Sequence, residues 1–175
     1  MPTTTEQYQE LVFGVLDFLK TDIIAPNSPG SAIETRYIAP EGNDDEQWLG
    51  FLRDDDMTVD IWLMTITQLA GLDQRDDRRG SVGTITKPMV IIFDYFADYR
   101  QGIDYVENVA TNTEREFLKK ILAVDLALEN KKGCLDGDKI MINSWDFQLK
   151  LKRFDNATVH WANGLLRLDL TDVFI

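Results

Sequence analysis

The chain has 175 residues, with 18 Lys and Arg against 30 Asp and Glu, and its net charge is −12 at neutral pH. This length suits a single domain with a buried core. The acidic balance argues against a general nucleic-acid-binding protein and against docking on anionic lipid. No apolar run approaches the roughly 18 to 20 residues of a membrane-spanning helix, and the first residues carry no basic, signal-like segment. We therefore expect a soluble protein made in the cytoplasm.

The first segment predicts an amphipathic helix. Its apolar side chains fall at helical spacing and form one stripe: Tyr8, Leu11, Val12, Val15, Leu16 and Leu19. Either Thr3 with Glu6 or Thr4 with Gln7 can form a capping box, because both pairs satisfy backbone amides of the first turn. The prolines and glycine of 26–30 end the helix and begin a loop.

Three strands are expected next, at 31–40, 57–68 and 84–99. The second has apolar side chains on both faces, which indicates a central place in a sheet. Two long polar connections separate these strands, an acidic one at 41–56 and a glycine-punctuated one at 71–83. We expect both to be exposed loops.

A second helix is predicted over 113–130. Thr113 with Glu116 is a capping box, and Gly133 is a stop signal just beyond the helix. The core stripe of this helix consists of Phe117, Ile121, Val124 and Leu128, with Leu118, Leu122 and Ala127 beside it.

The last segment predicts a hairpin with a turn at Asp155 and Asn156. In the first arm the side chains expected to point inward are Trp145, Phe147, Leu149 and Leu151. In the return arm the apolar positions change from odd to even numbers across Asn163 and Gly164. Such a change is what a β-bulge produces.

The element order is helix, three strands, helix, hairpin. Most strands are sequence neighbours, which favours an antiparallel α+β arrangement over a doubly wound parallel one. We predict a mostly antiparallel sheet of about five strands with two main helices packed on it. The single domain spans 1–175 and carries the long polar loops at about 41–56 and 71–83.

The sequence offers little to nucleophilic catalysis. His160 is the only histidine and Cys134 the only cysteine, so no disulfide forms within the chain. His160 lies on a hairpin arm whose odd positions are apolar, so we expect it to face solvent or a partner. Pairs of carboxylates always occur among 30 acids, and the sequence selects none of them for acid–base work. We therefore assign no catalytic residue and do not expect an enzyme.

No metal or cofactor site is predicted either. Asp54, Asp55 and Asp56 form an acidic cluster, and 136–138 resembles a fragment of a calcium loop, but neither has the ligand spacing of an EF-hand. One histidine and one cysteine cannot build a zinc site. The glycines of 80–83 are not followed by the Lys-Ser/Thr and helix of a phosphate-binding loop.

The loops hold the residues that we name as candidate contacts. The densest basic group of the chain consists of Arg75, Arg78 and Arg79. It alternates with Asp73, Asp76 and Asp77, so the simpler interpretation is an exposed loop that screens its own charge. The alternative is a contact between subunits. The candidate interface residues are Arg75, Arg78, Arg79, Asp54, Asp55 and Asp56.

The organisation of the chain resembles the phage tail terminator family, the small subunits that cap a tail tube and join it to the head. The resemblance lies in the order and size of the elements. The amphipathic first helix ends in a proline- and glycine-rich loop. Long strands at 58–68 and 89–99 flank the polar loop 71–83, and the helix 113–130 leads to a closing hairpin whose last strand is 165–172.

The resemblance implies a mechanical role. Six copies would form a ring on the tail tube, stop its polymerisation and contact neck or connector proteins, and the sheath in a contractile tail. The family implies no catalytic residue and no cofactor. Because the lumen would be acidic, DNA would pass through it without specific binding. The protein would be assembled in the host cytoplasm and remain in the virion.

Two other classes stay open. An acidic dimeric binding module, such as a secretion chaperone, would hold an unfolded partner on an apolar groove. Trp62, Phe96 and Trp161 look exposed in the strand pattern and would line that groove, although packing in the core or sheet explains them more simply. The third class is an enzyme with a carboxylate site. The oligomeric state separates the first two classes, because the terminator predicts a sixfold ring and the binding module predicts a twofold dimer.

Overall fold

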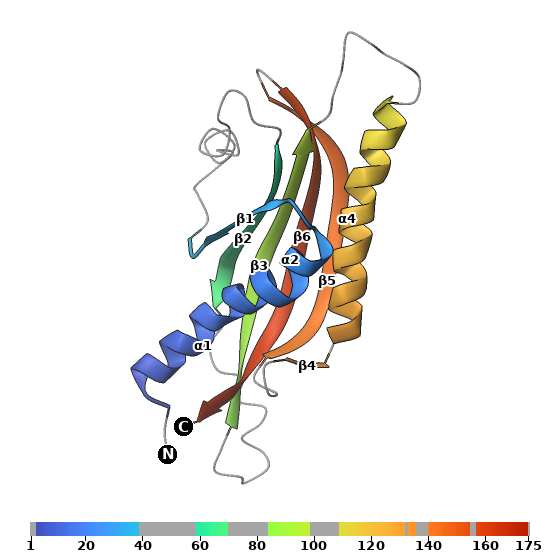
Figure 1. Ribbon diagram of the computed structural model, residues 1–175. Helices are drawn as coiled ribbons and strands as arrows, with labels where there is room; N and C mark the ends of the chain where they lie inside the picture. Colours follow the sequence, from blue (N-terminus) through green and yellow to red (C-terminus); the bar gives the residue numbers. More distant parts are fainter. Residues whose placement is uncertain are drawn as a thin grey trace.

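Figure 1 shows a computed structural model in which one long, twisted sheet carries its helices on one face. The structure describes residues 3–38, 59–69, 84–98, 109–131, 133–135, 140–154 and 157–174. The loops predicted at 41–56 and 71–83 lie outside these residues. In the described ranges, no helix has the length and apolar composition needed to cross a membrane.

Three α-helices and one π-helical turn are described, together with six strands. The helices are α1 (Thr5–Phe18), α2 (Ala25–Asn27) and α4 (Val109–Lys131), and a π-helical turn (Leu19–Ile24) joins α1 to α2. The strands are β1 (Ala32–Arg36), β2 (Asp60–Leu69), β3 (Thr84–Asp98), β4 (Gly133–Leu135), β5 (Ile140–Phe154) and β6 (Ala157–Phe174).

The strands form one sheet in the order β1-β2-β3-β6-β5-β4. All neighbours are antiparallel except β1 and β2, which are parallel. This arrangement confirms the predicted α+β fold, with two main helices on a mostly antiparallel sheet. The five predicted strands correspond to β1, β2, β3, β5 and β6, while β4 has only three residues and was not predicted.

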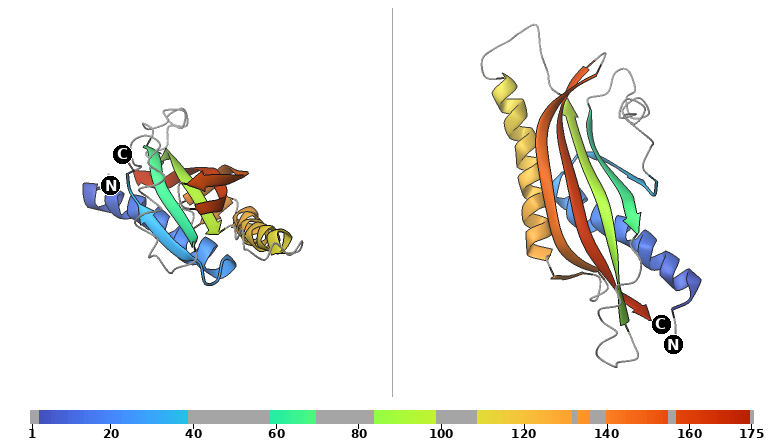
Figure 2. Two further views of the ribbon diagram at one scale, coloured as in Figure 1. Left: turned by 90° about the horizontal axis from the view of Figure 1, so that it is seen from above. Right: turned by 180° about the vertical axis from the view of Figure 1, so that it is seen from behind.

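The two long helices lie on the same face of the sheet, as the view from above in Figure 2 shows. Between them and the sheet lies the main core, to which α1, α4 and four strands contribute. The aromatic side chains of its centre stack on one another. Trp62 stacks on Tyr95 with ring centroids 4.5 Å apart, and Tyr95 stacks on Phe117 of α4 at 5.4 Å.

The start of α1 follows one of the two predicted capping patterns. The Thr4 side chain accepts a hydrogen bond from the Gln7 amide, and the Gln7 side chain accepts one from the Thr4 amide. The helical segment continues through the π-helical turn and ends after Asn27. Gly30 then adopts a φ of 80°, a left-handed conformation in which a side chain is strained.

The helix α4 begins earlier than predicted. It starts at Val109, so Thr113 lies inside the helix and the proposed capping box does not mark its first turn. The residues from Val109 to Asn112 include no glycine or proline, and a helix held by tertiary packing extends into such a stretch.

The predicted bulge in the last strand is absent. β3 pairs with β6 without a register shift through Asn163 and Gly164. The even positions of β6 from 160 to 170 face the helices, whereas Val159 joins a second, smaller apolar cluster on the opposite face. The change of parity in the sequence therefore reflects two apolar faces rather than an extra residue.

Gly164 is required by a close approach between strands. A Cβ atom at this position would lie 2.7 Å from the Phe147 ring and 2.8 Å from the Asp146 carbonyl oxygen. Glycine thus lets the aromatic ring of β5 lie across β6, which keeps these two long strands in register.

Candidate functional site

The predicted interface residues lie outside the part of the chain that the structure describes. They are Arg75, Arg78, Arg79, Asp54, Asp55 and Asp56. Their assignment to a subunit contact stays a prediction. The described residues instead contain one polar cluster beneath α4 and two apolar surfaces at opposite ends of the sheet.

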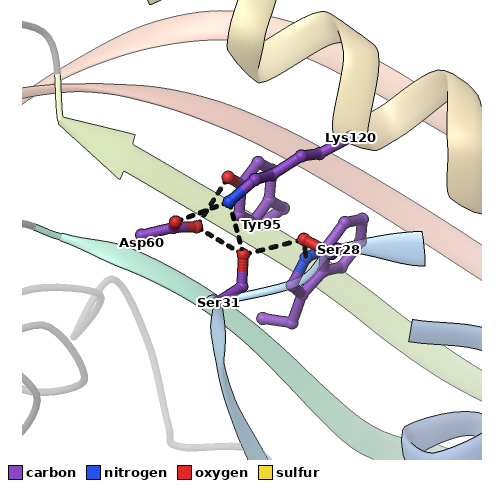
Figure 3. Close-up of polar contacts among 6 residues, drawn as sticks. Ser28, Ser31, Asp60, Tyr95 and Lys120 are labelled. Carbon is purple, nitrogen blue, oxygen red and sulfur yellow. Dashed lines mark hydrogen bonds and ion pairs between the residues drawn. The ribbon is translucent and has the colours of Figure 1, made fainter. Parts of the chain in front are cut away.

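The polar cluster joins four elements through Asp60 at the start of β2 (Figure 3). Lys120 of α4 forms an ion pair with the carboxylate, with Nζ 2.6 Å from Oδ2. The Ser31 hydroxyl donates to Oδ1 over 2.6 Å, and the Tyr95 hydroxyl donates to the same oxygen over 2.7 Å. One carboxylate therefore holds α4, β3 and the start of β1 against β2.

The hydrogen bonds of the two serines have a defined direction. Ser31 uses its only proton toward Asp60, and it accepts a hydrogen bond from the Lys120 ammonium over 2.9 Å. The contact of 2.7 Å between the two serine oxygens must then be donated by Ser28. Ser28 in turn accepts a hydrogen bond from the Trp62 indole over 2.9 Å. The chain of donors ends on the carboxylate.

This arrangement favours a structural brace over a reactive serine. Burial by itself raises the pKa of Asp60, but the hydrogen bonds from Lys120, Ser31 and Tyr95 and the charge of Lys120 hold it below the usual 3.8. A carboxylate with so low a pKa is a weak general base near neutral pH. Lys120 donates to Ser31 and is paired with Asp60, so it does not accept the serine proton.

His160 does not face solvent, contrary to the prediction. Its side chain is buried on the helix side of β6 and stacks on the Phe117 ring, with centroids 5.1 Å apart. Burial lowers the pKa of the imidazole, and the nearby charge of Glu114 acts in the opposite direction. The prediction failed because the even positions of β6, not the odd ones, face α4.

The prediction that Trp62, Phe96 and Trp161 line one apolar groove is also wrong. Trp62 lies in the main core, while Phe96 belongs to the smaller cluster on the other face of the sheet and stacks on Trp161. The indole of Trp161 and the amide of Asn163 both donate to Asp94, at 3.0 and 2.6 Å. Burial raises the pKa of this carboxyl, and the two hydrogen bonds and the charge of Lys150 only partly offset that effect.

One apolar surface lies at the β5 end of the sheet, and we call it the leucine surface. β4 pairs only with Ile140–Ile142, so among the described residues no strand pairs with the outer side of β5 from 143 to 154. Leu149 and Leu151 of β5, predicted to point inward, are 50% and 53% exposed. The helix α4 is fixed beside β5 by the hydrogen bond from Trp145 to Asp125, and we include its exposed leucines in this surface: Leu118, Leu122 and Leu126.

The other apolar surface lies at the β1 end, and we call it the aromatic surface. Its members Phe13 and Tyr37 are about half exposed, and their rings are 5.0 Å apart. Ile38 beside them is 83% exposed. Within the described residues, β1 has a strand partner on one side only, which is β2. Both ends of the sheet thus combine an open strand edge with apolar side chains.

These two surfaces account for nearly all of the large hydrophobic side chains that the described residues expose. The remaining one, Leu69, is the last residue of β2, beyond the part of that strand that pairs with β1. None of the nine lies in the middle strands β3 and β6. Surface apolar groups that gather at strand edges indicate contact sites rather than random exposure.

Sequence reasoning placed neither surface. A signal for the leucine surface was present in the sequence, because Leu118, Leu122 and Leu126 recur every four residues outside the core stripe of α4. Two apolar stripes on one helix are more than a single sheet face can bury. In the described part of the chain, no group of three His, Cys, Asp or Glu side chains is placed to hold a metal ion.

Comparison with known protein families gave no matching family, and comparison with curated proteins gave no matching protein.

Proposed function

We propose that the chain is a structural assembly subunit that acts as a phage tail terminator. Six copies would form a ring on the end of the tail tube, stop its growth and contact neck or connector proteins, and the sheath in a contractile tail. The protein would be a component of the virion, assembled in the host cytoplasm, without catalytic residue, metal or cofactor. The specific role rests on the resemblance in element order and size.

The observation that carries an assembly function is the pair of sheet edges that no strand of the described residues pairs with, each beside exposed apolar side chains. An edge strand with unpaired amides and carbonyls is a template for a strand of another chain, and monomeric proteins commonly block it with charge, proline or a covering segment. Leu126 and Leu122 are 60% and 55% exposed on a helix whose Val124 and Leu128 are fully buried in the main core. A partner chain would remove these groups from water.

The charge of the chain agrees with this role. Six copies would carry a formal charge of six times −12, or −72. A strongly acidic ring repels phosphate, so DNA would pass through it without being retained. The polar cluster around Asp60 fits the same role, because it fixes α4 to the sheet and so holds the leucine surface in place.

The experiment that tests the ring is the mass of the chain in solution over a concentration series, with electron micrographs of the same samples. The ring predicts six times 20.1 kDa, or 120.6 kDa, and particles with sixfold symmetry. A chain that remains a monomer or a dimer throughout the series contradicts the ring, as does growth into open filaments.

A second candidate is the acidic dimeric binding module, such as a secretion chaperone, and one observation favours it. The open edge of β5 matches a second copy of itself in antiparallel pairing about Gln148. That pairing sets Asp146 opposite Lys150 and Trp145 opposite Leu151. It predicts a stable mass of two times 20.1 kDa, or 40.2 kDa, at every concentration.

A further inference from the structure

The two open ends of the sheet point to one joint between copies of this chain. We propose that the outer edge of β5 pairs antiparallel with β1 of the next copy, with Lys150 opposite Glu34 of that copy, and that the leucine surface packs on the next copy's aromatic surface. This inference deepens the proposed function, because it names the contact that would build the ring. Its test is separate from the number of copies.

The directions of the strands permit this joint. In the order β1-β2-β3-β6-β5-β4, β1 runs opposite to β5. Copies related by rotation about an axis parallel to the strands therefore bring β5 and the next β1 together as antiparallel neighbours. The sheet continues from copy to copy, and the helices of all copies stay on the same face. A head-to-tail contact of this kind forms rings when the rotation closes.

The faces of the two strands match in the proposed register. Ile33 packs against the main core on the helix face, and Leu151 lies opposite His160 on that same face. Glu34 pairs with Leu63, and Lys150 lies over the Trp161 ring, so both charges are on the other face. Antiparallel partners point to the same side of a sheet, so Ile33 meets Leu151 while Glu34 meets Lys150.

The leucine surface lies at the level of the joint. Asp125 of α4 accepts a hydrogen bond from the Trp145 indole over 2.7 Å, which fixes the helix beside β5. Leu149 is four residues along the strand, roughly 13 Å at ~3.3 Å per residue, and the same distance along the antiparallel helix is about nine residues at ~1.5 Å. Leu118 therefore lies near the level of Leu149, beside the edge that β1 of the next copy would occupy.

Head-to-tail pairing explains more of the surface than pairing of two β5 edges. A twofold contact about Gln148 would cover the leucine surface of both copies but leave both aromatic surfaces, including Ile38 at 83% exposure, in water. The head-to-tail joint covers one surface of each kind. It also removes both open edges of the sheet at once, which is the way closed sheets avoid uncontrolled pairing.

The size of the resulting ring agrees with the proposed function. At the joint each copy contributes five strands, or roughly 24 Å at a spacing of ~4.8 Å. Six copies would then form a ring with a circumference of about 144 Å, which corresponds to a diameter of roughly 46 Å at the sheet. Such a ring is wide enough for a DNA duplex.

Charge reversal tests the joint in the full chain. Glu34→Lys places two lysines opposite each other and Lys150→Glu places two glutamates, so each variant alone should associate at least tenfold more weakly than the unaltered chain. In an equal mixture, opposite charges return at every joint where the two variants alternate, so the mixture should assemble in alternating order and its mass should return to that of the unaltered assembly. Light scattering measures all three samples.

The chain offers a matched control for this test. Glu116 and Lys119 form an exposed ion pair within one turn of α4, with both side chains more than 60% exposed. Glu116→Lys and Lys119→Glu change the charge by the same amounts outside the Glu34–Lys150 strand pairing, so each should weaken association much less than the two variants at the joint. Circular dichroism of all four variants establishes that each one is folded.

Cross-linking tests the register, in a chain whose native Cys134 is replaced by alanine. Glu34→Cys combined with Lys150→Cys should form disulfide-linked ladders, because directly opposite residues of antiparallel strands have the Cα separation that a disulfide needs. Glu34→Cys with Gln148→Cys is the control for a shifted register and should cross-link much less.

Three results would overturn the inference. Association that is unchanged in both reversal variants, or not restored by mixing them, removes Glu34 and Lys150 from the contact. A disulfide dimer formed by Gln148→Cys alone shows the twofold pairing instead. A ring of six copies without the Glu34–Lys150 cross-link would retain the proposed function and reject this joint. An open filament that does form the Glu34–Lys150 cross-link would confirm this joint and reject the ring of the proposed function.

Discussion

The two flanks of α4 have opposite surroundings. Lys120 on one flank reaches the carboxylate of Asp60 and completes a network with Ser31 and Tyr95. Leu122 and Leu126 lie on the side of the helix that is turned away from the main core, and both remain more than half exposed. A single helix thus has one side whose polar group is paired with the sheet and another side whose apolar groups remain exposed. The contrast separates what holds the domain together from what is left for another chain.

The strongest test of this contrast replaces one leucine on each side of α4. Leu128 is fully buried in the main core and Leu126 is 60% exposed. Leu128→Ala should lower the free energy of unfolding by about 2–5 kcal/mol, because it leaves a cavity. Leu126→Ala should change it by less than about 0.5 kcal/mol in dilute, unassociated protein. Urea denaturation of both variants measures the difference.

Equal losses for the two leucines would break the comparison, since Leu126 would then be part of the core. The association measured by light scattering supplies the complementary readout. Leu126→Ala should weaken assembly although it barely affects folding, because its side chain lies on the leucine surface.

A smaller effect is expected from the paired lysines of α4. Lys120→Met removes the partner of a partly buried carboxylate and should cost about 1–2 kcal/mol, between the values for exposed and buried ion pairs. Lys119→Met removes only the exposed pair with Glu116 and should cost much less, because solvent screens exposed ion pairs. Denaturation at neutral pH compares them.

Acid should reduce the cost of Lys120→Met. The folded pKa of Asp60 lies below the usual 3.8, so the carboxylate stabilises the fold above that value and loses this contribution as the pH falls through the folded pKa. The difference between the two proteins should therefore shrink in that range. A difference that is constant with pH would place the effect of Lys120 elsewhere than in the ion pair.

The smallest effect concerns His160. Burial lowers its pKa in the folded chain below the usual 6.5, so the unfolded chain takes up the proton first as the pH falls. The contribution of the neutral His160 side chain to the stability of the unaltered chain should be complete above pH 6.5. It should decrease as the pH falls from 6.5 to the folded pKa. His160→Gln should have a flatter stability profile in this window. Thermal unfolding in buffers from neutral to mildly acidic pH measures both profiles.

Much of the fold follows from local pattern. The stripe of α1, the core stripe of α4 and the apolar runs of β2 and β3 are set by periods of 3.6 and 2 residues, which local sequence contains. The same reasoning failed for β6, where Val159 and Trp161 look like a core face. They belong to the smaller cluster behind the sheet, and an alternating pattern does not say which of two apolar faces the helices cover.

The sequence by itself determined that this chain forms an α+β domain with two main helices on a mostly antiparallel sheet. Only the tertiary structure decided which side chains meet: it joined Asp60 to Lys120 across 60 positions, buried His160 beneath α4, and left Leu149 and Leu151 exposed. The physical reason is that periodicity gives each element a face, but strand order and helix placement decide which faces are covered. The strand edges that the described residues leave unpaired, on β1 and β5, exist only in the assembled sheet.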